Sequence, residues 1–257
     1  MSLAVSVAYF VRHGKASAFS SSTDYDQLSP PGVEQSELLG AWLADEGLRF
    51  DGVFVGPRKR HEQTYACVTR VLATRGLRIP EPVLLPELDE HDGISLVFKM
   101  LPALAAEDAE LQEIAASIAR SGRPSAEDVL AAFKRITRRW ARGEIGHDEV
   151  EAWPAFRARV ARGMERIAAL GRGKTALVFT SAGAVAAATA QAVGIGAGRG
   201  AVEDEERVLD LSWSLYNASI TQLEFAADEG ARPSTRWGMR SFNGVPHLRD
   251  RRLVTSV

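Results

Sequence analysis

Short apolar runs typical of β-strands alternate along the chain with amphipathic helical segments, and this alternation limits the fold more than any other feature. The strand-like runs are residues 5–11, 53–55, 83–85, 176–179, 219–225 and 236–242. The helical segments are residues 30–46, 60–74, 126–142, 153–170 and 184–193. Strands that are joined through helices pair in parallel and are covered on both faces. The sequence therefore predicts an α/β fold, a three-layer α/β/α sandwich with a mostly parallel central sheet.

The stretch from about residue 94 to 170 departs from this alternation. It is rich in alanine, helical in period and interrupted near residues 122–124 and 143–146. We interpret it as a helical insertion or cap whose last helix returns to the sheet. A chain of 257 residues is long enough for one large domain of this kind, so residues 1–257 are predicted to form a single domain.

Composition narrows the class of protein. A formal net charge of −2 provides no basic field for nucleic acid or for an anionic membrane, so an anion site has to be built locally from a few arginines. Cys67 is the single cysteine, which excludes an internal disulfide and a multi-cysteine metal site. The N-terminal apolar run is too short to cross a membrane, lacks a basic leader and is followed at once by Arg12. We expect a cytoplasmic protein.

Chemically active residues follow the ends of four predicted strands. Arg12-His13-Gly14 follows the first strand, residues 56–60 the second, residues 87–93 the third and residues 180–183 the fourth. In open α/β sheets, ligands bind at the carboxyl ends of the strands. One histidine, several arginines and several carboxylates should thus meet at one edge. Phosphoryl transfer through nitrogen needs such a set: a nucleophile, guanidinium groups for the oxygens and an acid for the leaving group.

The chain resembles the histidine phosphatase superfamily, also called phosphoglycerate mutase-like. The resemblance covers nearly the whole chain, and its segments occur in the order found in the family. They are residues 10–14 (FVRHG), 28–32 (LSPPG), 60–64 (RHEQT), 88–90 (LDE), 156–160, 217–220 (NASI), 242–243 and 247–248. Arg-His-Gly alone is a weak signal, whereas the joint set is a specific one.

The resemblance implies a role for each matching residue. His13 would be the nucleophile that forms a phosphohistidine, and Arg12 and Arg60 would bind the phosphoryl oxygens. Glu90 would donate a proton to the leaving oxygen and then activate water, although Glu87 and Asp89 lie close enough in the sequence to compete for this role. The scheme implies a small phosphorylated substrate and needs no metal and no cofactor. A homodimer is compatible with the sequence.

Residues 180–183 depart from the pattern of the family. The family carries a second histidine in a Ser-His-Gly-Gly type turn, where this chain has Ser181 in the sequence Thr-Ser-Ala-Gly. A serine hydroxyl is a shorter and neutral donor, and loss of one preorganised donor costs on the order of 3 kcal/mol, or ~10²- to 10³-fold in rate. Ser181 is interpreted as a phosphate-binding residue, as a helix N-cap, or as both. His61 and His91 adjoin the motifs and are candidates to replace the missing imidazole.

Two functions follow from these residues. The first is a phosphatase that acts through a phosphohistidine at His13 and is slowed by Ser181, with mutase activity less favoured. The alternative is a weak or inactive family member that binds phosphorylated ligands or a protein partner. A loose dinucleotide-binding glycine pattern at residues 196–201 is set aside, because it follows a helix and precedes the acidic residues 203–206.

Overall fold

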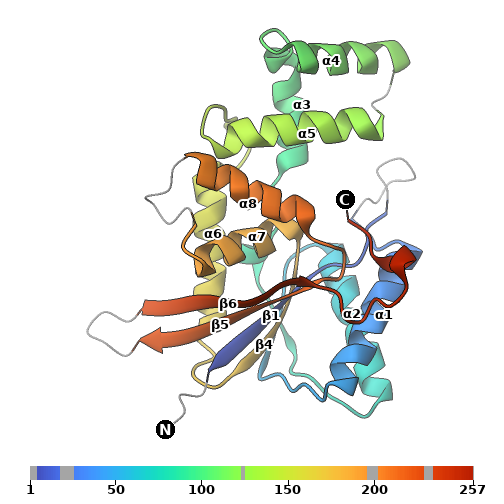
Figure 1. The fold of residues 1–257 in the computed structure, drawn as a ribbon, viewed down its shortest axis with the longest axis vertical. Helices are drawn as coiled ribbons and strands as arrows, with labels where there is room; N and C mark the ends of the chain where they lie inside the picture. The colour runs from blue at the N-terminus through green and yellow to red at the C-terminus, as the bar shows by residue number, and fades with distance from the viewer. Residues whose placement is uncertain (1–4, 18–25, 123–124, 196–201, 229–233, 257) are drawn as a thin grey trace.

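A computed structural model describes residues 5–17, 26–122, 125–195, 202–228 and 234–256 (Figure 1). Its strands are β1 (Ser6–Arg12), β2 (Gly52–Val55), β3 (Pro82–Leu84), β4 (Thr175–Thr180), β5 (Ile220–Asp228) and β6 (Ser234–Gly244). Its helices are α1 (Pro30–Asp45), α2 (Lys59–Thr74), α3 (Gly93–Leu104), α4 (Ala109–Ser121), α5 (Ala126–Ala141), α6 (Trp153–Ala168), α7 (Ala182–Ala192) and α8 (Val202–Ser214). The predicted strands and helices are confirmed, with ends shifted by no more than three residues. The glycine pattern at 196–201 and the interruption at 123–124 lie outside the described residues.

The six strands form one sheet in the order β3-β2-β4-β1-β5-β6. β3, β2, β4 and β1 are parallel, and β5 and β6 extend the sheet as antiparallel strands. The α/β class and the mostly parallel sheet are thereby confirmed. β1 lies between β4 and β5, so the residues that follow β1 emerge at the centre of the sheet.

Alternate residues of the parallel strands face two different cores, because successive side chains of a strand point to opposite faces. Val11, Val53 and Phe179 pack with α1 and α2 on one face. Phe10 and Val178 pack on the other face with α6 and α7. All five side chains are buried, as expected for strands covered by helices on both sides.

Helix α1 begins and ends as its sequence predicts, and its start supports the loop after β1. The side chain of Ser29 caps the helix by accepting a hydrogen bond from the Gly32 N–H, and Gly47 lies beyond its end with a φ of 64°. A Cβ at Gly14 would lie 2.4 Å from the Gly32 carbonyl oxygen. Only glycine therefore allows the loop that carries His13 to approach α1 this closely.

The region predicted as an insertion contains helices in two positions. Helices α3, α4 and α5 lie together away from the sheet and are named the cap, whereas α6 packs on the sheet side (Figure 1). Helix α8 was not among the predicted elements, because the glycine-rich run before it favoured a loop. Its acidic first turn was a helix signal that the prediction did not use, and Val208 and Leu209 of α8 are buried. No helix in the described residues is long and apolar enough to cross a membrane.

We expect Phe156→Ala to lower the free energy of unfolding by about 3–5 kcal/mol, because Phe156 of α6 is fully buried and its removal leaves a cavity. Phe98→Ala is the matched control, since Phe98 is 57% exposed on α3. It should change stability by less than about 0.5 kcal/mol. Urea denaturation followed by circular dichroism measures both; equal losses would contradict this packing.

His247, which follows β6, is buried, and burial lowers its pKa to about 4 from 6.5. Below pH 6.5 the unfolded chain binds a proton here that the folded chain does not, so stability present above that pH is lost as the pH falls toward about 4. Between about pH 7 and about pH 5 this loss is on the order of 2 kcal/mol. His247→Gln should shrink the fall in unfolding free energy between these pH values by that amount. An unchanged fall in urea titrations would show that His247 does not cause it.

Candidate active site

The carboxyl ends of β1, β2, β3 and β4 bring four loops together, because the backbone ladder continues past the strands. The His13 N–H donates to the Thr180 carbonyl at 2.9 Å, and the Ala218 N–H donates to the His13 carbonyl at 3.1 Å. On the other side of β4, the Gly56 N–H donates to the Phe179 carbonyl at 2.9 Å. The backbone of His13 is therefore held from both sides.

The ring of His13 is buried and fixed through both of its nitrogens. Nδ1 lies 2.7 Å from the Gly14 carbonyl, which can only accept a hydrogen bond, so Nδ1 is the donor. Nε2 then accepts from Arg60 Nε at 3.1 Å. Burial, followed by the positive charges of Arg60 and Arg12, holds the pKa of His13 well below 6.5. The ring is therefore neutral at pH 7, with its Nε2 lone pair directed at a guanidinium.

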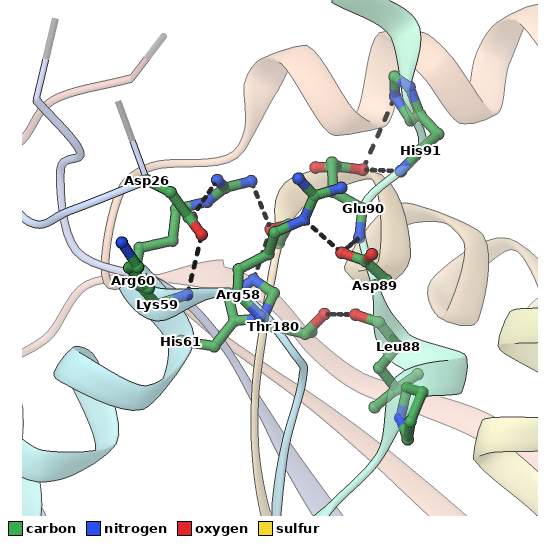
Figure 2. A network of polar contacts seen from close by, with 12 residues as sticks. Asp26, Arg58, Lys59, Arg60, His61, Leu88, Asp89, Glu90, His91 and Thr180 are labelled. Atoms are coloured by element: carbon green, nitrogen blue, oxygen red, sulfur yellow. Dashed lines mark hydrogen bonds and ion pairs between the residues drawn. The ribbon is translucent and has the colours of Figure 1, made fainter. Parts of the chain in front are cut away.

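Arg60, in the first turn of α2, is the cation that joins the residues of the site. Besides His13, its guanidinium contacts Ser181 Oγ at 3.4 Å and Asp26 Oδ1 at 2.7 Å. Figure 2 shows Asp26 between Arg60 and Lys59, whose backbone N–H donates to the other carboxylate oxygen at 3.0 Å. Asp26 thus occupies donors that suit a phosphate. No sequence motif contains Asp26, so sequence analysis could not identify this residue.

Arg12, the last residue of β1, is 3% exposed. Its Nη1 donates to the carbonyl of Leu215, just after α8. Its charge also lowers the pKa of His13. Arg12 therefore lies close enough to the ring to act on it electrostatically while its side chain is anchored to backbone.

Ser181 occupies the N-cap position of α7, but its side chain makes no capping hydrogen bond to that helix. Its hydroxyl instead lies 2.6 Å from Nε2 of His61. Both side chains are fully buried, and the His61 ring lies 5.7 Å from the His13 ring, centroid to centroid. Of the two histidines considered as replacements, His61 is the one in contact with Ser181.

The three neighbouring carboxylates have different partners in the fold. Glu87 forms an ion pair with Arg166 of α6 at 2.9 Å, and Asp89 pairs with Arg58 at 2.5 Å (Figure 2). Glu90 accepts hydrogen bonds from the backbone N–H groups of Gly183 at 3.1 Å and His91 at 3.0 Å. Among the three, Glu90 is the one bonded to the Ser181 turn.

The environment of Glu90 favours its charged form. Burial acts to raise its pKa, but the His91 ring, the Gly183 N–H and Arg60 together outweigh burial and lower it. The His91 ring lies with Nε2 3.7 Å from Glu90 Oε1. It packs among Phe133 and Trp140 of the cap and Phe156 of α6. One buried histidine therefore connects the cap to this carboxylate.

The site offers a neutral imidazole nitrogen, two buried guanidinium groups, a hydroxyl and a carboxylate within one cluster. Such a set can receive a tetrahedral anion and exchange a proton with it. No group of three or more histidine, cysteine or acidic side chains among the described residues is arranged to hold a metal ion.

Three of the solved structures with a similar fold are a mutase and two phosphatases by their names. A phosphoglycerate mutase from Bacillus anthracis matches with a TM-score of 0.57 and 17% identity, covering 96% of each chain. A mycobacterial glucosyl-3-phosphoglycerate phosphatase matches with a TM-score of 0.61 and 15% identity over 93% of this chain and 99% of its own. The α-ribazole phosphatase from Shigella flexneri gives 0.54 and 19% identity over 93% and 96%. At such identities these likenesses establish the fold alone.

No curated protein sequence matches the chain significantly. The family model of the histidine phosphatase superfamily (branch 1) matches residues 8–96 and 95–233. These two matches span most of the chain and include the loops that carry His13, Arg60, Glu90 and Ser181. The chain belongs to the histidine phosphatase superfamily.

Proposed function

We propose that this protein is a phosphatase for a small phosphorylated substrate and that it acts through a phosphohistidine at His13. The observation that carries the proposal is the neutral, buried Nε2 of His13 facing Arg60 at 3.1 Å. A nitrogen nucleophile needs its lone pair free of a proton, and an entering phosphoryl group needs cations at the point of attack. This one contact supplies both conditions.

The first step forms the N–P bond and breaks the P–O bond to the leaving group. As the anion enters, Arg60 exchanges its contacts with Asp26 and Nε2 for the phosphoryl oxygens, and Arg12 adds its charge from β1. Ser181 donates a hydrogen bond from the start of α7. Guanidinium groups suit this role because their charge persists and their fork of donors matches the oxygens.

Glu90 exchanges the proton. Its pKa is low in the ligand-free site, but a phosphate dianion placed beside it repels its negative charge and raises that pKa. Substrate binding thus favours the protonated form that the leaving oxygen requires. After the alcohol leaves, the carboxylate accepts a proton from the water that attacks phosphorus, and phosphate and free His13 result.

A hydrolytic outcome fits this site better than a mutase outcome. Re-transfer requires a long-lived phosphohistidine, and the neutral hydroxyl of Ser181 stabilises it less than an imidazolium would. The alternative, a protein that binds phosphorylated ligands with little turnover, is favoured by the Asp26 carboxylate, which competes with phosphate for Arg60 and the Lys59 N–H. Vanadate binding without turnover over a wide pH range would establish that alternative.

We expect His13→Ala to abolish hydrolysis of para-nitrophenyl phosphate and Arg60→Ala to reduce kcat/KM by at least ~10²-fold, since one removes the nucleophile and the other a buried charge on the phosphoryl group. Arg70→Ala, which removes a 60% exposed arginine from the same helix, is the control and should retain activity. Base-quenched protein should carry an acid-labile phosphoryl group on His13. Turnover by His13→Ala equal to that of the wild type would reject the mechanism.

We also expect Glu90→Gln to show a leaving-group dependence. With an alkyl phosphate kcat/KM should fall ~10²- to 10⁴-fold, because an alkoxide needs a proton. With para-nitrophenyl phosphate the fall in kcat/KM should be much smaller, because nitrophenolate leaves as an anion and kcat/KM does not include the later attack of water on the phosphohistidine. Glu87→Gln removes only the ion pair with Arg166 and should behave like the wild type with both substrates. Equal losses for the two substrates would show that Glu90 is not the acid.

A further inference from the structure

We propose that His61 is a positioning residue that orients the Ser181 hydroxyl as a hydrogen-bond donor to the phosphoryl group. The inference deepens the proposed function and rests on it. The turn at residues 180–183 has no imidazole to donate a hydrogen bond to the phosphoryl group. The Ser181 hydroxyl, held by His61, takes that donor role instead.

The ring of His61 has a fixed place. His61 lies in the first turn of α2, where its backbone N–H donates to the Arg58 carbonyl at 2.9 Å, and its side chain is fully buried. A Cβ at Gly56 would lie 2.5 Å from its Nδ1, so the ring fills the space that glycine leaves at the end of β2. The imidazole therefore approaches Ser181 from the end of β2, the strand next to β4.

The direction of the His61–Ser181 bond follows from the other ring nitrogen. The Arg58 backbone N–H points at Nδ1 at 3.4 Å and can only donate, so Nδ1 accepts. A neutral ring then carries its proton on Nε2 and donates it to Ser181 Oγ at 2.6 Å. Burial, followed by the Arg60 charge, lowers the pKa of His61 well below 6.5 although contact with the Gly56 backbone acts to raise it, and the ring stays neutral.

Two donors then converge on the Ser181 oxygen. His61 Nε2 donates at 2.6 Å, and Arg60 Nη2 donates at 3.4 Å. A hydroxyl has two acceptor positions and one proton. With both acceptor positions filled, the proton of Ser181 is left to donate to a third group. An anion held by Arg60 beside His13 is that group.

The test measures orthovanadate affinity by calorimetry, which does not require turnover. Ser181→Ala and His61→Ala should each weaken binding ~10- to 10²-fold, as expected for loss of a hydrogen bond to a charged group. The double variant should be no weaker than Ser181→Ala alone, because the two residues act through one hydroxyl. His61→Gln, whose amide N–H can donate to Oγ, should recover most of the affinity.

Ser6→Ala is the matched control. Ser6 is also buried and hydrogen-bonded, through Oγ to the Gly171 carbonyl at 3.0 Å. It begins β1, about 20 Å of strand away from His13. This variant should bind vanadate like the wild type, and circular dichroism checks that each variant is folded. Should His61→Ala fail to fold, Ser181→Ala and the wild-type ring tautomer still decide the question.

Nitrogen NMR of the wild-type histidines provides an independent readout. His61 should carry its proton on Nε2 and stay neutral from about pH 8 to about pH 6. A proton on Nδ1, donated to the Gly56 carbonyl, would mean that Ser181 spends its own proton on His61, and the inference would be wrong. Additive losses in the double variant, wild-type affinity in His61→Ala, or no vanadate binding by the wild type would also overturn it.

The inference and the proposed function can fail separately. Vanadate binding with the expected coupling, but without turnover that depends on His13, would keep the donor pair and reject the phosphatase. Turnover that depends on His13, with affinity indifferent to His61, would keep the phosphatase and reject the pair.

Discussion

The contact between His13 Nε2 and Arg60 Nε is the interaction on which the site depends. A buried imidazole beside a guanidinium cannot easily take up a proton, so its Nε2 lone pair stays unprotonated at pH 7, as the proposed nucleophile requires. A guanidinium with 5% exposure has in turn lost most of its water and needs polar partners. Asp26 and Ser181 provide them in the ligand-free protein, which places both where an anion would be bound. The proposed nucleophile, the proposed anion site and the Asp26 carboxylate that competes for it all depend on the contact between His13 and Arg60.

The pair of Ser181 and His61 differs in charge from the second histidine that the family carries. A donor imidazolium would lose its proton as the pH rises through neutrality, whereas the proposed Ser181 hydroxyl, held by a neutral ring, keeps its proton in that range. His61 comes from α2 and Ser181 from the turn after β4, so this donor is built across two neighbouring strands. A histidine placed at position 181 would meet the ring of His61 in a space with no exposure. The serine and the buried histidine therefore belong together.

Much of the fold was predictable, because the short, mostly apolar runs of β1, β2 and β4, which are buried on both faces, and the helix ends marked by Ser29 and Gly47 are local signals. The clustering of Arg12, His13, Arg60, Glu90 and Ser181 was predictable in outline, since parallel strands end at one edge; their catalytic roles stay predictions. The partners of each side chain were not predictable. Asp26 lies in no motif. The three carboxylates at 87–90 are equivalent in the sequence and are distinguished only by the backbone N–H groups and arginines that they contact. The choice of His61 over His91 depends on contacts between residues that follow neighbouring strands.

The packing of His91 has a consequence for how substrate preference can evolve in this protein. Its ring contacts Phe133 and Trp140 of the cap and lies beside Glu90. The cap residues that hold His91 therefore help set the electrostatics of Glu90, the carboxylate proposed to exchange the proton. Remodelling of those residues for a new ligand would disturb the chemistry at the same time. Substitutions on the parts of α3, α4 and α5 that do not contact His91 should leave the pKa of Glu90 unchanged. A different ligand is therefore easier to accommodate there.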